Sequence, residues 1–307
     1  MKKKVVAGSV LAVVVLSLVL AIALKPGNGP TSETAAGRGD VGVLYIDGPI
    51  ASGRGGGGPF AAQTGSEELA AALRAATRDP QLKAVVIRLN SPGGTPAAAQ
   101  EISAEVDRLK QSGKIVVASM GDTAASGAYW IAAGADRIVA NPGTLTGSIG
   151  VIMEQYNLQG LYGKLGVDTE TFKSGAHKDM GSSSRPVTPE ERVIFQAMID
   201  DIYAQFVDVV AKGRRKDAAE IRPLADGRVF TGRQAKELGL VDNLGDFQDA
   251  VLLAGELAGI PGEPSVVELG TRSFWQEIFR GTGGSTFWGL VRPGFLYQGE
   301  AGYLNLQ

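Results

Sequence analysis

Ser126 stands where a folded chain could present a nucleophilic hydroxyl. It follows a β-branched run, residues 114–119, that is typical of a buried strand. The alanine-rich residues 128–133 behind it predict a buried helix that ends at Gly134. A strand, a tight turn of small residues and a helix is the arrangement in which several hydrolases hold a reactive serine. Because a serine hydroxyl is a weak nucleophile until a base takes its proton, the chain must also supply that base.

The first kind of base to consider is histidine. The chain holds one histidine, His177, and no cysteine, which excludes thiol nucleophiles, disulfides and multi-histidine metal sites. The residues around Ser126 do not form G-x-S-x-G, and S-x-x-K occurs nowhere. Composition alone leaves a histidine triad open, and lysine is the other available base.

A lysine base must be neutral, so its pKa must fall from about 10.4 to near the working pH. Burial among apolar groups supplies such a shift, which predicts a lysine in a segment of small, uncharged residues. Lys173 and Lys178 both lie in segment 172–179, after an expected strand. Asp179 beside Lys178 argues against a neutral amine there unless its side chain points away. Both lysines stay candidates on this reasoning.

The negative charge that develops on an attacked carbonyl needs fixed hydrogen-bond donors. Gly93 and Gly94 stand at an expected strand-to-helix turn, where a bare backbone can approach a ligand closely. Gly127, directly after the serine, can provide a second N–H group at the start of a helix. Gly94 and Gly127 are therefore candidate oxyanion donors for Ser126.

The elements that must position these residues alternate between strand and helix. The pattern predicts strands at 41–46, 82–89, 114–119, 137–140, 149–153 and 167–172, and helices at 67–77, 97–110, 128–133 and 189–212. Thr95 and Thr188 are expected helix caps, each followed by a proline at the first helical position. The last helix should stop at Gly213, and its apolar stripe predicts core packing: Ile194, Met198, Ile202, Phe206 and Val209. This order predicts an α/β layered fold with a mainly parallel sheet.

The first 25 residues predict a membrane anchor. Residues 5–24 carry no charge and follow three lysines, and this length spans a bilayer. The lysines should stay cytoplasmic, which places the rest of the chain on the outer face. A cleaved signal peptide is the rival interpretation, because residues 21–23 resemble a cleavage site. Without the four lysines up to residue 25, the chain holds 26 basic and 32 acidic residues, so no nucleic-acid partner is implied.

Five segments together resemble a known family. They match, in order, the signal peptide peptidases of the bacterial short form, which belong to peptidase family S49 and the crotonase/ClpP-like superfamily. The matching segments are 89–94, 124–129, 145–151, 173–179 and 226–232. The resemblance covers about residues 41–255, and the expected anchor fits it as well.

The resemblance implies a Ser/Lys dyad. It assigns Ser126 as the nucleophile and Lys178 as the general base, with Gly94 and Gly127 as the oxyanion hole. Ser148 would orient the lysine amine. Lys173 is the reserve base, because longer members of the family place their lysine in a similar lysine-serine setting. His177 would then be a neighbour of the base and no catalyst.

The resemblance also implies a homo-oligomer, because this chain is too short to hold two copies of the domain. Its substrates would be remnant signal peptides in the bacterial inner membrane, and no cofactor or metal is expected. The predicted organisation is an anchor (1–25), a linker (26–40), a peptidase domain (41–260) and an aromatic, glycine-rich tail (261–307). An acyl-CoA hydratase or isomerase of the same superfamily and a non-enzymatic membrane scaffold are the competing hypotheses.

Overall fold

The computed structural model describes residues 39–55 and 64–270. The expected membrane anchor, nearly all of the linker and the aromatic residues of the tail lie outside this part of the chain. Within it, no helix is long and apolar enough to cross a membrane.

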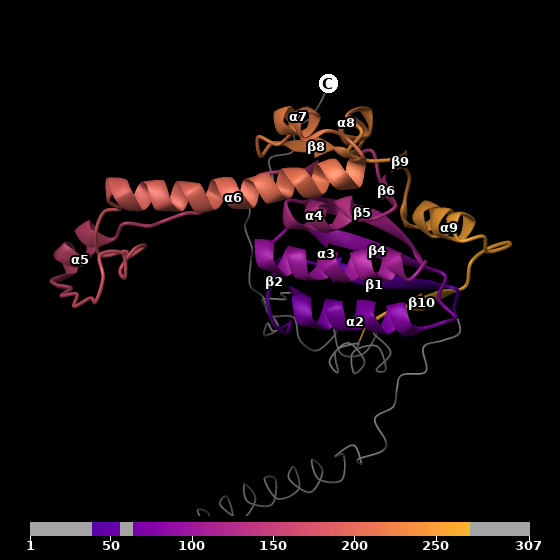
Figure 1. Cartoon of the computed structure of the whole chain (residues 1–307), viewed down its shortest axis with the longest axis horizontal. Coiled ribbons are helices and arrows are strands. Elements are labelled where there is room, and N and C mark those ends of the chain that lie inside the picture. Colours follow the sequence, from indigo (N-terminus) through magenta and orange to yellow (C-terminus); the bar gives the residue numbers. More distant parts are fainter. Residues whose placement is uncertain (1–38, 56–63, 271–307) are drawn as a thin grey trace, which may run out of the picture.

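A mainly parallel sheet forms the centre of the fold (Figure 1). Its strands lie in the order β10-β1-β4-β5-β6-β9, and each neighbouring pair is parallel. The bounds are β1 Val41–Asp47, β4 Ala84–Ser91, β5 Ile115–Ala125, β6 Arg137–Ala140, β9 Asn243–Leu244 and β10 Val266–Glu268. The sequence prediction of a mainly parallel α/β fold is confirmed.

Beyond residue 120, β5 changes its neighbour. Its last residues pair in parallel with β7 (Leu145–Gly147), which pairs antiparallel with β8 (Val229–Thr231). A separate pair of short strands, β2 (Ile50–Ala51) and β3 (Thr64–Gly65), lies beside the sheet. The end of β5 therefore lies between β4 and β7, and Ser126 follows directly after it.

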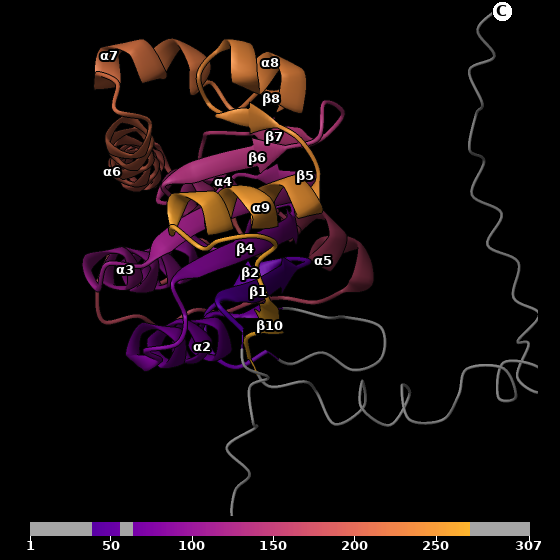
Figure 2. The same cartoon turned by 90° about the vertical axis from the view of Figure 1, so that its right-hand side faces the viewer.

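Helices cover both faces of the sheet (Figure 2). One face packs against α2 (Ser66–Arg78), α3 (Pro96–Gln111), α4 (Gly127–Ala133) and part of α6 (Pro189–Arg214), and the other packs against α9 (Phe247–Leu257). Burial on both faces explains the nearly continuous apolar runs of the central strands. The remaining short helices are α5 (Gln159–Leu165), α7 (Ala218–Ile221), a 3₁₀ turn (Arg222–Leu224) and α8 (Gly232–Glu237).

An extended feature, which we call the arm, comprises residues 152–199. Helix α6 has 26 residues and is about 39 Å long at 1.5 Å per residue. Its C-terminal half packs on the core through Phe206, Val207, Val210 and Ala211. Its N-terminal half extends beyond the sheet and carries α5 at its far end (Figure 1).

Four sequence predictions are wrong, and the arm accounts for three of them. Residues 149–153 and 167–172 do not form strands. The exposed residues of both segments belong to the arm, which lies away from the sheet and offers no strand to pair with. The stripe on α6 is core packing only from about Phe206 onward, and Met198 is 38% exposed. Helix α6 also continues through Gly213 to Arg214. A Cβ at Gly213 would lie 1.9 Å from the Ala133 carbonyl oxygen, so this glycine permits close packing on α4 rather than ending the helix.

Candidate active site

Ser126 occupies the turn between β5 and α4. Its φ is 52° and its ψ is −122°, a conformation that is strained for a residue with a side chain. Hydrogen bonds hold it in place: its N–H donates to the Gly147 carbonyl at 2.9 Å, and its carbonyl accepts the Trp130 N–H at 2.9 Å. Helix α4 behind it is buried along its whole length. The turn therefore holds a half-buried serine on a fixed backbone, as a nucleophile needs.

Gly94 and Gly127 bring backbone N–H groups next to this serine, and Gly93 is part of the same contact. Gly93 packs against the turn so tightly that a Cβ there would lie 2.7 Å from the Gly127 nitrogen. A Cβ at Gly127 would lie 3.2 Å from the Gly94 nitrogen, so the two candidate N–H groups are neighbours. No backbone hydrogen bond among the described residues uses either of them as a donor. The pair has the arrangement of an oxyanion hole.

Strand β2 fixes the glycine turn from the other side. Ile50 donates its N–H to the Gly93 carbonyl at 2.9 Å, and its carbonyl accepts the Thr95 N–H at 3.0 Å. A Cβ at Gly94 would lie only 1.8 Å from the Ile50 oxygen. Only glycine fits there, and sequence reasoning did not connect Ile50 with the site.

Ser148 lies in the turn that follows β7, and it too has a positive φ, 49°. Its N–H donates to the Arg228 carbonyl at 2.8 Å, and the Gly227 N–H donates to the Ile149 carbonyl at 3.1 Å. Asp226 shapes this second turn, because its carboxylate accepts the N–H and the guanidinium of Arg228. The same ion pair lowers the pKa of Asp226 to about 2. Ser126 and Ser148 are thus joined through Gly147 and the end of β5.

Lys178 is not beside Ser126 in the single chain. It lies on the arm, in the loop between α5 and α6, and its side chain is exposed. Figure 1 places this part of the arm well away from α4. In the described part of the chain, the Lys178 amine has no hydrogen bond or ion pair, and neither does the Ser126 hydroxyl. The structure brings together Ser126, Ser148, Gly94 and Gly127, and it leaves Lys178 apart.

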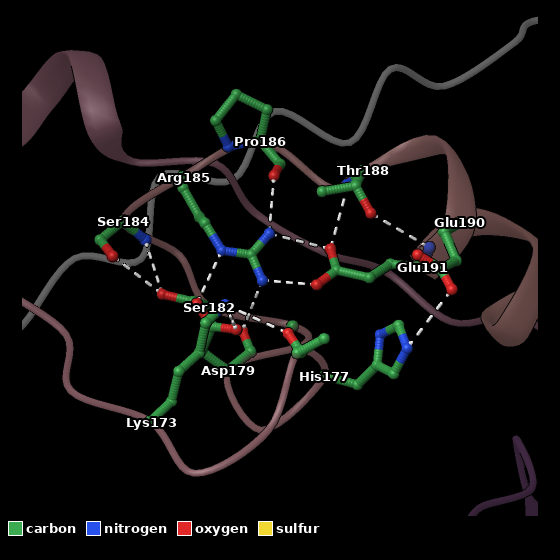
Figure 3. A network of polar contacts seen from close by, with 12 residues as sticks. Lys173, His177, Asp179, Ser182, Ser184, Arg185, Pro186, Thr188, Glu190 and Glu191 are labelled. Atoms are coloured by element: carbon green, nitrogen blue, oxygen red, sulfur yellow. Dashed lines mark hydrogen bonds and ion pairs between the residues drawn. The ribbon is translucent and has the colours of Figure 1, made fainter.

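Lys173, the reserve base, is held by other groups. Its Nζ donates to Asp179 Oδ1 at 2.8 Å and to the Ala176 carbonyl at 3.1 Å. Asp179 also accepts from Arg185, whose guanidinium reaches Glu191 at the start of α6 (Figure 3). The Lys173 amine is thus held by Asp179 and the Ala176 carbonyl within its own loop, which disfavours this lysine as the partner of Ser126.

Sequence reasoning missed this charged network. Asp179, Arg185 and Glu191 are six residues apart, a spacing that belongs to no regular element. No group of three or more histidine, aspartate or glutamate side chains is placed to hold a metal ion in the part of the chain that the structure describes.

Comparison with known proteins identifies the family to which this site belongs. The sequence profile of peptidase family S49 matches residues 108–261, half of the chain. The chain belongs to peptidase family S49. It is therefore a serine-type protease, and the family resemblance seen in its motifs is confirmed.

The similar proteins differ in how much of their length this chain matches. A putative protease of Synechocystis sp., slr0021, is 46% identical over 66% of this chain and 76% of its own length. A putative signal peptide peptidase of Enterococcus faecium is 44% identical over 58% of this chain and 52% of that protein. A solved structure of a mutant of the 1510-N membrane-bound stomatin-specific protease shares 17% identity, covers 76% of this chain and 99% of that chain, and has a TM-score of 0.47.

Proposed function

We propose that this S49 protease is a membrane-anchored endopeptidase that cleaves remnant signal peptides with a Ser126/Lys178 dyad. The observation that carries the proposal is the Ser126 turn, with its strained backbone and its two neighbouring glycine N–H groups. The name of the Enterococcus relative supports the substrate class. The finer fold assignment, a layered fold of the crotonase/ClpP type, is part of the same proposal.

The proposed reaction has two halves. Lys178 Nζ takes the proton from Ser126 Oγ while Oγ attacks the substrate's carbonyl carbon, and the N–H groups of Gly94 and Gly127 bind the oxyanion. The ammonium then protonates the departing amine, which leaves an acyl-enzyme. In the second half, Lys178 takes a proton from water while the water oxygen attacks the acyl carbon. The ammonium then returns this proton to Ser126 Oγ as the acyl product leaves, which restores the neutral amine. Ser148 orients the amine through its hydroxyl.

The lysine of each site comes, in this proposal, from a second copy of the chain. Lys178 lies on the arm of its own protomer, away from Ser126, so one chain cannot complete the dyad in this conformation (Figure 1). The arm also carries many of the exposed large apolar side chains: Ile152, Met153, Tyr156, Leu161, Leu165, Val167, Phe172, Val193 and Met198. An exposed apolar patch of this kind marks an interaction surface. A homo-oligomer would cover it and bring Lys178 to a neighbour's Ser126.

Burial at that interface is what would make Lys178 a base. Desolvation by a neighbouring protomer would favour the neutral form of an amine, which is the form that can take a proton. Residues 1–25 supply the proposed anchor, with the catalytic domain on the outer face of the bacterial inner membrane. Membrane-embedded peptide remnants would then lie close to the sites.

Hydrolysis of fluorogenic peptides by the full chain in detergent tests this function. Ser126→Ala and Lys178→Ala should each abolish cleavage, while thermal unfolding stays that of the wild type. Lys164→Ala removes another exposed arm lysine and is the matched control; it should keep near-normal activity. Full activity in Lys178→Ala together with loss in Lys173→Ala would show that the base is assigned wrongly. If Ser126→Ala still cleaves the peptide, Ser126 is not the nucleophile.

A further inference from the structure

The loop that carries Lys178 is clamped by one arginine side chain (Figure 3). Arg185 donates through Nε to Asp179 Oδ2 at 2.9 Å and through a terminal nitrogen to the Asp179 carbonyl at 3.2 Å. It also donates to both oxygens of Glu191, at 2.9 and 2.5 Å. Glu191 is fixed in turn, because it forms a capping box with Thr188 at the start of α6. Arg185 therefore ties the Lys178 loop to a rigid helix end.

Asp179 is fully engaged by this clamp. One of its oxygens accepts from Lys173 and the other from Arg185. These hydrogen bonds hold the pKa of the Asp179 carboxyl well below its usual range, and those from Arg185 and Thr188 lower the pKa of Glu191 to about 2. The side chain of Asp179 is only 13% exposed. Its charge is thus paired with Lys173 and Arg185 and not with Lys178, its neighbour in the chain.

We propose that Arg185 is a positioning residue for the catalytic amine: it holds the Lys178 loop on α6 and keeps the Asp179 carboxylate from pairing with Lys178. This inference rests on the proposed role of Lys178 as base. A carboxylate that contacts an amine favours its protonated form, and a protonated amine cannot take the serine proton. The clamp would therefore keep the dyad active at neutral pH.

Other charged groups near the loop have partners of their own. They are Lys173 and His177 in the loop, Arg185 after it, and Glu190 and Glu191 at the start of α6. His177 Nε2 lies 3.5 Å from Glu190 Oε1, and Glu191 is bound by Arg185. Glu154, Asp168 and Glu170, elsewhere on the arm, form no ion pair with this network among the described residues. Loss of Arg185 would free Asp179 Oδ2 and both Glu191 oxygens from the guanidinium, but Glu191 Oε2 still accepts the Thr188 N–H. Asp179 is the freed carboxylate that adjoins Lys178 in the chain.

The test is the pH dependence of kcat/KM, whose acid limb reports the essential base of the free enzyme. Arg185→Gln should move the midpoint of that limb upward by about one to three pH units, lower kcat at neutral pH and leave KM nearly unchanged. The double variant Asp179→Asn/Arg185→Gln lacks the released carboxylate. Its midpoint should return to the wild-type value, although kcat stays reduced because the loop is still unclamped.

A merely structural role for Arg185 predicts a different result. In that case Arg185→Gln lowers the rate with no shift of the midpoint, or the double variant keeps the shift, and either outcome overturns the proposal. If Arg185→Gln is inactive, the pH dependence of Lys178 acylation by acetic anhydride, followed by peptide mass spectrometry, replaces the kinetic profile. The same midpoint in wild type and variant would then contradict the proposal.

Lys178→Ala, measured alongside, distinguishes a failure of the proposed function from a failure of the proposed role of Arg185. Activity in Lys178→Ala means that the proposed function fails at its base, whatever Arg185 does. An inactive Lys178→Ala together with an unshifted Arg185→Gln means that only the role of Arg185 fails.

Discussion

The Ser126 turn and the Lys178 loop are built in opposite ways, and their glycines show the difference. Around Ser126, a Cβ at Gly93, Gly94 or Gly127 would meet backbone atoms within 3.2 Å. On the arm, a Cβ at Gly160, Gly163 or Gly175 would meet nothing within 4 Å. The Ser126 turn is closely packed within one chain, whereas the glycines of the arm that carries Lys178 have open space around them.

This contrast indicates what each half needs in order to work. The turn depends on close backbone contacts that form when the chain folds. The loop is held by charged side chains, Asp179, Arg185 and Glu191, and its amine has no partner within the described part of the chain. The first half is complete within one chain, whereas the second would, under the proposal above, need a neighbouring chain beside it.

The largest expected effect comes from adding a methyl group to the packed half. Gly94→Ala would place a Cβ 1.8 Å from the Ile50 carbonyl oxygen, which must displace an oxyanion donor. Loss of one such donor lowers kcat by roughly 10²–10³. Gly163→Ala, inside α5 on the arm, is the matched control and should leave kcat unchanged. Steady-state hydrolysis of the same peptide measures both, and equal activities would mean that the Gly94 turn is not part of the site.

A charge introduced on the apolar surface of the arm should lower activity by weakening the contact between protomers. Val193 is 70% exposed on α6, and Val193→Asp should weaken packing between protomers, because a carboxylate is costly to bury. We expect a smaller particle in sedimentation, at least about a tenfold loss of activity and unchanged thermal unfolding of the protomer. Leu252→Asp, on the exposed side of α9 and 43% exposed, serves as the control. Unaltered sedimentation and activity in Val193→Asp would contradict the proposal that the arm packs against a second copy of the chain.

The smallest effect compares two threonine caps. Thr188 accepts the Glu191 N–H at 3.2 Å, whereas the Thr95 side chain accepts no capping hydrogen bond at the start of α3. Thr188→Ala should cost about 1 kcal/mol of helix stability and speed hydrogen exchange at the start of α6. Thr95→Ala should leave exchange at α3 nearly unchanged. A larger increase in hydrogen exchange at α3 in Thr95→Ala than at α6 in Thr188→Ala would contradict this prediction.

The central body was predictable from the sequence because its signals are local. Buried parallel strands require apolar runs, and residues 137–140 form β6 as expected. The capping box at Thr188 likewise places the start of α6 correctly. Ser126, Gly94 and Gly127 could be proposed together because turns at the ends of neighbouring parallel strands meet at one edge of a sheet.

The arm was not predictable in the same way. Its apolar residues, such as Val167 and Phe172, look like strand residues, but both are exposed in the single chain and pair with no strand. Sequence reasoning expected a buried lysine, and the protomer shows Lys178 exposed. The Arg185 network escaped detection because its members come from a loop and a helix end that no periodicity links.

Mixing two inactive variants tests the central claim most directly. Ser126→Ala chains keep Lys178, and Lys178→Ala chains keep Ser126. If each site takes its lysine from a neighbour, random assembly of equal amounts should restore roughly a quarter of the wild-type activity. The mixture should be co-refolded or exchanged in detergent, with subunit mixing verified by two affinity tags. A mixed oligomer that stays inactive would contradict the account, because it would mean that serine and lysine must belong to the same chain.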